Sequence, residues 1–128
     1  MKIAALIARI LLGLVFLVFG LNGFLQFIPT GPLPSGVAGQ FLSALIQSHY
    51  VLVVSAFQLA GGVLLLVNRY VPLALTLLGP VIANIFLYHL LMDRSGLPIA
   101  IAVVALWGIL AFRHRQYFSG LFVQKTSS

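Results

Sequence analysis

Long apolar runs alternate with short polar breaks along the whole of this 128-residue chain. A helix rises about 1.5 Å per residue, so roughly 20 apolar residues cover the about 30 Å of hydrocarbon in a bilayer. Four runs come close to that length, and each ends at residues that carry charge or stop a helix. They predict membrane-spanning helices over about residues 3–28, 50–67, 70–92 and 97–112.

The first run also has to be considered as a secretory signal peptide. It is too long for one, and no small-residue cleavage site precedes the polar segment, so we expect a retained span. The Pro29–Pro34 segment that follows it cannot continue a helix. In the middle of the third run, Pro80 lacks an amide proton, which predicts a kink there.

Residues 35–49, between the first two spans, are too few and too polar to cross the membrane. A helical projection separates an apolar face from a polar face: Val37, Phe41, Leu42 and Leu45 against Gln40, Ser43 and Gln47. This predicts a short amphipathic helix in the interface or over the bundle mouth, with a plain loop as the alternative. The expected fold is all-α, an integral membrane four-helix bundle with this interfacial helix, in a single transmembrane domain over residues 1–128.

Composition supports a membrane environment. The chain is 62% hydrophobic and 6% charged, whereas a soluble domain is about 25% charged. This excludes an ordinary soluble enzyme, a disordered chain and a coiled coil. The net charge of +6 does not indicate nucleic acid, because the basic residues interrupt apolar runs instead of forming an exposed stripe. No cysteine is present, which excludes disulfides and Cys-ligated metal centres.

The basic residues predict the orientation of the chain. Four spans place both termini on one side of the membrane. Six of the seven basic residues belong to that side: Lys2, Arg9, Arg69, Arg113, Arg115 and Lys125. Only Arg94 belongs to the other side. The positive-inside rule therefore predicts cytoplasmic N and C termini.

Polar residues inside the spans are the candidates for a functional site, because polar groups in hydrocarbon cost free energy and usually face the bundle interior. Gln58 and Asn84 lie about 12 Å below the outer interface by helical rise, and Asn22, Gln26 and His89 also belong to the outer half. The candidate ligand-binding residues are Arg9, Asn22, Gln26, Gln58, Asn84 and His89. Interhelical hydrogen bonds, worth about 0.6 kcal/mol each, are the alternative role for these side chains.

Arg9 shares one helical stripe with Gly13, Phe16 and Gly20. Glycines on a stripe let another helix approach closely. Arg9 is therefore expected either to point into the bundle near its cytoplasmic end or to extend to the inner interface.

His89 and Asp93 are one helical turn apart, so they could form a relay, while an ion pair between Asp93 and Arg94 is the alternative. The strong ligands do not group into a metal site. Paired carboxylates, a Ser–His–acid set and a phosphate loop are missing from the sequence, so it contains no self-contained catalytic constellation.

Three blocks, residues 9–24, 58–75 and 80–89, resemble in order the DoxX family of small four-helix bacterial membrane proteins. The family is named after a small subunit of a quinone-linked sulfur-oxidising enzyme, and other members are associated with membrane oxidoreductase complexes. The resemblance places Arg9, Asn22, Gln58, Asn84 and His89 at the family's polar positions. Members commonly have Glu where this chain has Gln58, and an amide cannot take up a proton.

The resemblance implies a bacterial inner-membrane protein that is a subunit or accessory of a quinone-linked oxidoreductase. Its outer-half polar residues would bind a quinone or another lipid headgroup, and a redox protein partner would supply electrons. Two alternatives stay open: a small transporter or channel, which could be a homo-oligomer, and a structural or assembly protein without a ligand. The predicted spans contain no Asp or Glu that could take up a proton, which argues against proton-driven transport.

Overall fold

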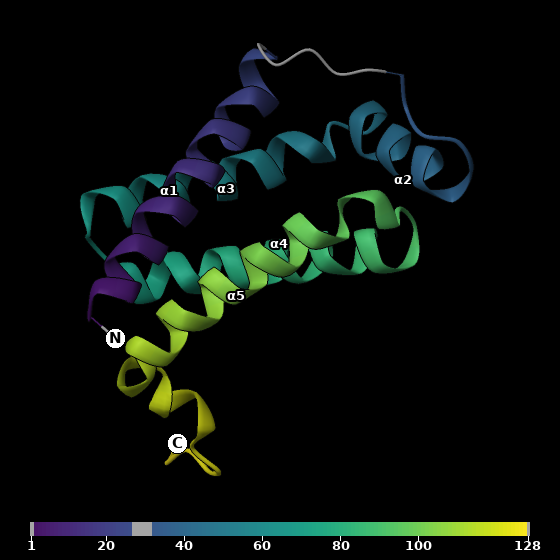
Figure 1. The fold of residues 1–128 in the computed structure, drawn as a ribbon. Helices are drawn as coiled ribbons and strands as arrows, with labels where there is room; N and C mark the ends of the chain where they lie inside the picture. Colours follow the sequence, from purple (N-terminus) through teal and green to yellow (C-terminus); the bar gives the residue numbers. More distant parts are fainter. Residues whose placement is uncertain (1, 27–31, 128) are drawn as a thin grey trace.

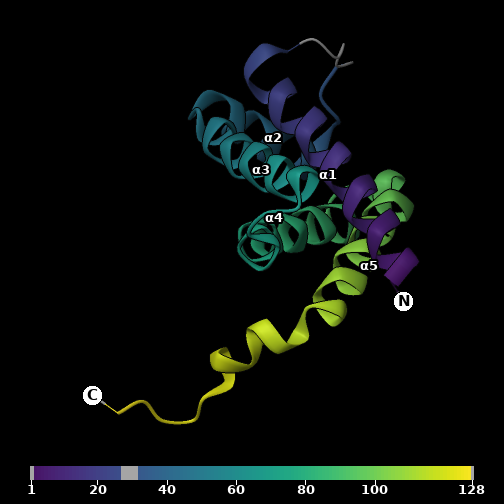
Figure 2. The ribbon, with the colours of Figure 1, turned by 90° about the vertical axis from the view of Figure 1, so that its left-hand side faces the viewer.

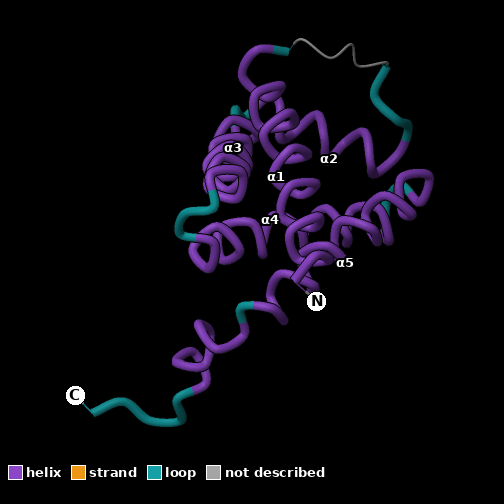
Figure 3. The backbone as a smooth tube through the Cα atoms, turned by 60° about the vertical axis from the view of Figure 1, so that its left-hand side comes forward, coloured by secondary structure: helices purple, strands orange, loops and turns teal. Residues whose placement is uncertain are grey.

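The computed structural model describes residues 2–26 and 32–127, which form helices joined by short connections (Figures 1 and 3). In chain order the elements are α1 (Lys2–Leu25), α2 (Gly36–Gln47), α3 (Tyr50–Val67), α4 (Val71–Leu91), η1 (Arg94–Gly96), α5 (Leu97–Arg113) and η2 (Arg115–Phe122). The described ranges contain no strand. Four helices are long and apolar enough to cross a membrane: α1, α3, α4 and α5 with η1. The predicted all-α fold with four candidate spans is confirmed.

The ends of the helices follow local chemistry. Pro72 lies in the first turn of α4 and Pro98 in the first turn of α5, where a missing amide proton costs nothing. α4 continues as one helix through Pro80. α1 ends at Leu25, and Gln26 has a left-handed φ of 52°, so this side chain stands outside the helix. Residues 27–31, which include part of the predicted Pro29–Pro34 break, lie outside the described residues.

Both ends of the chain lie at the same end of the bundle (Figure 1). We call this the terminal end; it holds the start of α1, the α3–α4 turn and the end of α5. The other end, which holds the end of α1, the whole of α2 and the α4–α5 connection, is the mouth end. η2 and the tail extend away from the terminal end (Figure 2).

α1 and α3 cross with their backbones in contact. A Cβ atom on Gly62 would lie 2.6 Å from the Leu17 amide nitrogen and 2.9 Å from the Gly13 carbonyl oxygen. A Cβ on Gly20 would lie 2.6 Å from the Leu59 nitrogen. Such contacts require glycine, as they do in other closely packed membrane helices. The stripe of small residues predicted on the first span is therefore the α3-facing side of α1.

Most of the buried core lies in the half of the bundle nearest the terminal end, and Val103 of α5 extends it towards the mouth end. Its members are Ala5, Ala8, Leu12, Phe16, Leu65, Val71, Ala74, Leu75, Leu78, Val81, Ile82, Val103 and Leu110. The core part of α1 stops at Phe16, and α3 contributes only Leu65 to the cluster. α1 and α3 stay packed on each other towards the mouth end, but this pair separates from α4 and α5 (Figure 1).

Trp107 links α5 to α4 within the closed half. Its indole N–H donates to the Leu75 carbonyl oxygen at 3.0 Å. The ring packs beside Gly79, where a Cβ would make an ordinary van der Waals contact with the indole at 3.6 Å. An indole N–H in an apolar setting needs an acceptor, so this bond fixes the register of the two helices.

Candidate functional site

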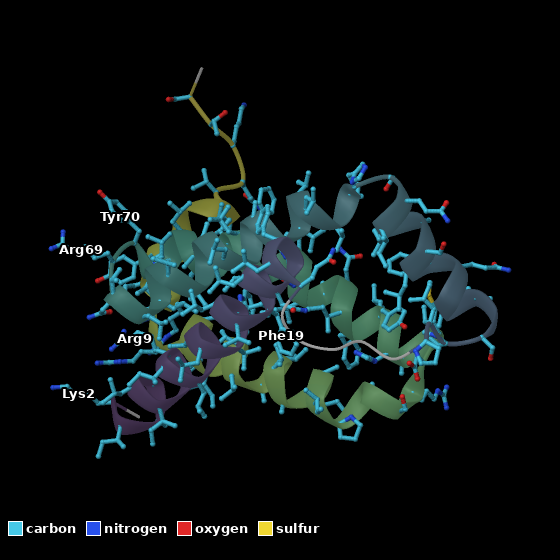
Figure 4. All side chains as sticks on the ribbon, turned by 90° about the horizontal axis from the view of Figure 1, so that it is seen from above. Lys2, Arg9, Phe19, Arg69 and Tyr70 are labelled. Atoms are coloured by element: carbon cyan, nitrogen blue, oxygen red, sulfur yellow. The ribbon has the colours of Figure 1, made fainter. Side chains whose placement is uncertain are left out.

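The candidate site is the half of the bundle beyond the core, which we call the open half. Phe19 follows Leu12 and Phe16 on the same face of α1 at helical spacing. Leu12 and Phe16 are fully buried, yet Phe19 is 53% exposed. The change occurs where α1 diverges from α4 and α5, and Figure 4 shows Phe19 midway along the molecule. An aromatic side chain on the bundle-facing side is thus left uncovered.

Gln58 lies on the buried face of α3. It is spaced on one helical face with Ser55, Gly62 and Leu65, all of which are buried. Gln58 itself is half-buried, and its side chain makes no hydrogen bond within the described part of the chain. Ser55 is buried against Gly23 of α1, which closes the α1–α3 pair beside it. The Gln58 amide therefore retains its full donor and acceptor capacity.

His89 continues the buried face of α4, after Leu78, Ile82 and Ile85. Its Nδ1 lies 3.1 Å from the backbone carbonyl oxygen of Asp93. A carbonyl oxygen only accepts, so this bond places the ring proton on Nδ1 and leaves Nε2 of a neutral ring as an acceptor. Gly96 packs against the same ring, because a Cβ there would collide with it.

Neither interaction predicted for Asp93 is the one that the structure shows. The carboxylate oxygen Oδ1 accepts from the Ser95 backbone N–H at 3.2 Å and from the Ser95 hydroxyl at 2.6 Å, which caps η1. Arg94 instead donates from Nε to the Leu90 carbonyl oxygen at 3.2 Å. The possible His89–Asp93 relay is not formed, because His89 contacts the backbone carbonyl of Asp93 while Ser95 engages the carboxylate.

These bonds give a titration prediction. Ser95 holds the pKa of Asp93 below its ordinary value, chiefly through its hydroxyl and then through its backbone N–H. The capping contribution to stability is therefore present above the unfolded-state pKa and lost as the pH falls through the folded pKa. Ser95→Ala should raise the pKa of Asp93 towards its ordinary value. Because Asp93 is the only acidic side chain, ¹³C-labelled aspartate gives one carboxyl NMR signal to follow.

Ser119→Ala is the control for this titration, since Ser119 donates only to the Gln116 carbonyl oxygen in η2. It should leave the Asp93 signal unchanged. An unchanged Asp93 pKa in Ser95→Ala would contradict the capping arrangement.

Three of the other sequence candidates lie elsewhere. Asn84 is exposed and donates from Nδ2 to the Pro80 carbonyl oxygen of its own helix at 2.9 Å. Asn22 is half-buried, and its backbone carbonyl accepts from the Gln26 N–H. Gln26 is exposed beyond the end of α1. Of the mouth-side candidates, Gln58 and His89 are the two that continue the buried faces of their helices.

Arg9 belongs to the terminal end instead. Its Nη1 donates to the Leu65 carbonyl oxygen at 2.5 Å and lies 3.4 Å from that of Leu66. These carbonyls belong to the last turn of α3, where the helix dipole is negative and carbonyl partners are scarce. Arg9 thus points from α1 into the bundle, where its charge stabilises the C-terminal end of α3.

α2 covers part of the mouth end. The Phe41 ring lies 5.6 Å from the Tyr88 ring of α4, and α2 also contacts α3. Phe41, Leu42 and Leu45 are half-buried, whereas Val37 at the start of the helix is exposed. The predicted amphipathic helix is therefore present, and it bridges α3 and α4.

A hollow lined by apolar side chains lies beside the open half. It has a volume of about 450 Å³ and lies on the flank of the α1–α3 pair, lined by Phe24, Ala56, Leu59, Ala60, Val63 and Leu64. Gln58 is not part of its lining. This surface suits an acyl or isoprenoid chain better than a polar group.

Phe19 is not distinguished by the sequence pattern, because a phenylalanine in an apolar span carries no polar signal. Its spacing from Leu12 and Phe16 is the available signal. Trp107 has a clearer signal, since a lone indole N–H in an apolar helix needs an acceptor. Among the described residues, no group of three His, Cys, Asp or Glu side chains could hold a metal ion.

The fold and the site define a small all-α chain with four candidate membrane spans, whose buried core lies mostly towards the terminal end. No protein-family model, no curated protein and no solved structure matches this chain. The resemblance to the DoxX family therefore stays a prediction from the residues.

Proposed function

We propose that the chain is a DoxX-like bacterial inner-membrane protein with cytoplasmic termini that binds a quinone or a similar lipid in its open half. It would act as an accessory or subunit of a quinone-linked oxidoreductase. The observation that carries the proposal is that Phe19 and Gln58 lie on the interior faces of their helices, yet Phe19 stays exposed and the Gln58 side chain has no hydrogen bond to any described residue. A ligand with an apolar body and a polar head would cover both.

The polar groups suit a quinone–quinol couple. The Gln58 amide can donate to a quinone carbonyl or accept from a quinol hydroxyl. His89 Nε2 can accept from a hydroxyl, because its Nδ1 is engaged by the Asp93 carbonyl. Phe19 offers an aromatic surface for the ring. Electron transfer would fall to a redox protein partner, as the resemblance implies.

Other polar side chains in the spans form hydrogen bonds within or between helices, so we assign them a structural role. Asn84 bonds within α4, Arg9 stabilises the end of α3, and Trp107 joins α5 to α4. A protein with a purely structural role would bury its open half against another chain instead of a lipid. Ligand retention separates the two functions.

The test is the quinone content of the protein purified in mild detergent, measured by extraction and mass spectrometry. The wild type should retain a lipid-soluble quinone, and Gln58→Leu should reduce the retained amount about tenfold, because a buried hydrogen-bonded contact is worth about 1.5 kcal/mol. The matched control is Asn84→Leu, which makes the same change on an outward face and should retain quinone normally. Absence of quinone from the wild type, or equal loss in both variants, would contradict the proposal.

A further inference from the structure

A second pocket lies at the terminal end, far from the open half. It has a volume of about 340 Å³ and forms where three helices meet. Lys2 and Arg9 contribute from α1, Asn68 from the end of α3, and Arg113 and His114 from the end of α5. Figure 4 shows Lys2 and Arg9 directed to this end of the molecule. We call it the basic pocket.

Within the described residues, no acidic side chain neutralises the positive charge of the basic pocket. The only acidic side chain of the chain, Asp93, lies in the α4–α5 connection at the mouth end. Within the described residues, neither the Lys2 ammonium nor the Arg113 guanidinium has a hydrogen-bonding or ion-pairing partner. Arg9 is held by the Leu65 carbonyl, so its charge is fixed in place at the wall. Three permanent cations therefore surround one hollow.

His114 also lines the basic pocket. It caps α5, just beyond the membrane-spanning residues. Partial burial lowers its pKa, and the adjacent Arg113 lowers it further. A bound anion would oppose the contribution of Arg113 and would therefore raise the pKa of His114.

The remaining walls are apolar and continuous with the outer surface of the helices. Ile3 and Leu6, both strongly exposed, line the pocket on α1, and the buried Leu110 forms part of it on α5. Lys2 and Arg9 are about 10 Å apart along α1 by helical rise. A ligand that fits this surface has an anionic head at the level of Lys2 and Arg113 and an apolar part along Ile3 and Leu6.

We propose that the basic pocket binds the phosphate of an anionic membrane lipid, with the acyl chains along the exposed apolar side of α1. A free phosphate shares the head-group chemistry but leaves Ile3 and Leu6 uncovered, so we assign the lipid as the source. Basic pockets between membrane helices bind anionic headgroups through this combination of charges. The site is independent of quinone binding in the open half.

The test compares lipid retention by the full-length detergent-purified protein in native mass spectrometry. Phosphatidylglycerol should be retained over phosphatidylcholine. The double variant Lys2→Gln with Arg113→Gln should weaken phosphatidylglycerol binding about tenfold or more, since each basic residue near the surface contributes about fivefold. Both side chains are exposed and have no partner among the described residues, so the fold should survive, which circular dichroism checks.

The matched control removes two charges from the same end of the molecule without touching the pocket. Arg69 lies in the α3–α4 turn, and Arg115 packs over the Phe112 ring at 4.3 Å; neither lines the pocket. Arg69→Gln with Arg115→Gln should change binding less than threefold. Equal weakening in both double variants would show a general surface-charge effect and overturn the site.

Two further measurements distinguish a lipid headgroup from free phosphate as the ligand. The NMR titration of His114 should shift upward in phosphatidylglycerol nanodiscs relative to phosphatidylcholine nanodiscs in the wild type, and not in the pocket double variant. Inorganic phosphate at millimolar concentration should neither displace the lipid nor reproduce the shift. If phosphate alone does both, the pocket binds a soluble anion and the lipid assignment is wrong.

Discussion

Gly62→Leu is expected to force α1 and α3 apart and to lower the free energy of unfolding by about 3 kcal/mol. Overpacking of a well-packed contact typically costs 1–3 kcal/mol. Here the new side chain would meet the backbones of Leu17 and Gly13, which cannot rotate away. The effect should therefore lie at the upper end of that range. Reversible unfolding in mixed detergent–SDS micelles, followed by circular dichroism, measures it.

Gly108→Leu is the matched control for this substitution. Gly108 is also a helix glycine, in α5, but a Cβ there meets nothing within 4 Å. This variant should be as stable as the wild type or slightly more stable, because glycine is the poorer helix former. If Gly62→Leu were as stable as the wild type, the result would contradict a backbone contact between α1 and α3 at Gly62.

Phe16→Ala should cost about 3 kcal/mol of stability, while Phe19→Ala on the same helix should cost less than about 1 kcal/mol. Removing a buried Phe typically costs 3–5 kcal/mol. The lower value applies because lipid around the unfolded helices is also apolar, so mainly packing is lost. Phe16 is 1% exposed and Phe19 is 53% exposed, although both face the bundle interior.

The comparison of the two phenylalanines tests where the core ends. The same unfolding measurement serves both variants, and the chemistry removed is identical. Equal, large losses would show that the bundle is closed along its full length, and no open half would exist.

The helices themselves were predictable from the sequence because each apolar run ends at a strong local signal. Pro72 and Pro98 begin α4 and α5, and Asn68 ends α3 in a left-handed conformation. The close approach of α1 to another helix also followed from the spacing of Gly13 and Gly20. These are properties of short segments, so they can be inferred without the tertiary arrangement.

The division into closed and open halves could not be predicted. It depends on the angle at which the α1–α3 pair meets α4 and α5, which no local pattern encodes. Helices that are apolar on all sides also hide which face is interior. Counting residues from the span ends places Asn84 and Gln58 at the same depth in the membrane. In the structure, however, Asn84 faces outward and Gln58 faces inward.

The partner of His89 shows a second limit. The spacing of His89 and Asp93 correctly placed the two residues in contact, but the contacting atom is the Asp93 backbone carbonyl. Ser95, two residues further on, takes the carboxylate instead. Local side-chain to backbone bonds of Asp and Ser compete with longer-range pairing, so spacing alone does not decide the partner.

Photo-cross-linking with an azidoquinone, followed by peptide mapping of the wild-type protein in a bilayer, tests the proposed ligand site most directly. Adducts should concentrate on the interior faces of the open half, at Phe19 and Gln58, and excess unmodified quinone should suppress them. Outward-facing Val18 and Asn84 lie at similar depth and should remain unlabelled. Adducts spread evenly over outward and inward faces, or insensitive to competing quinone, would contradict quinone binding in the open half.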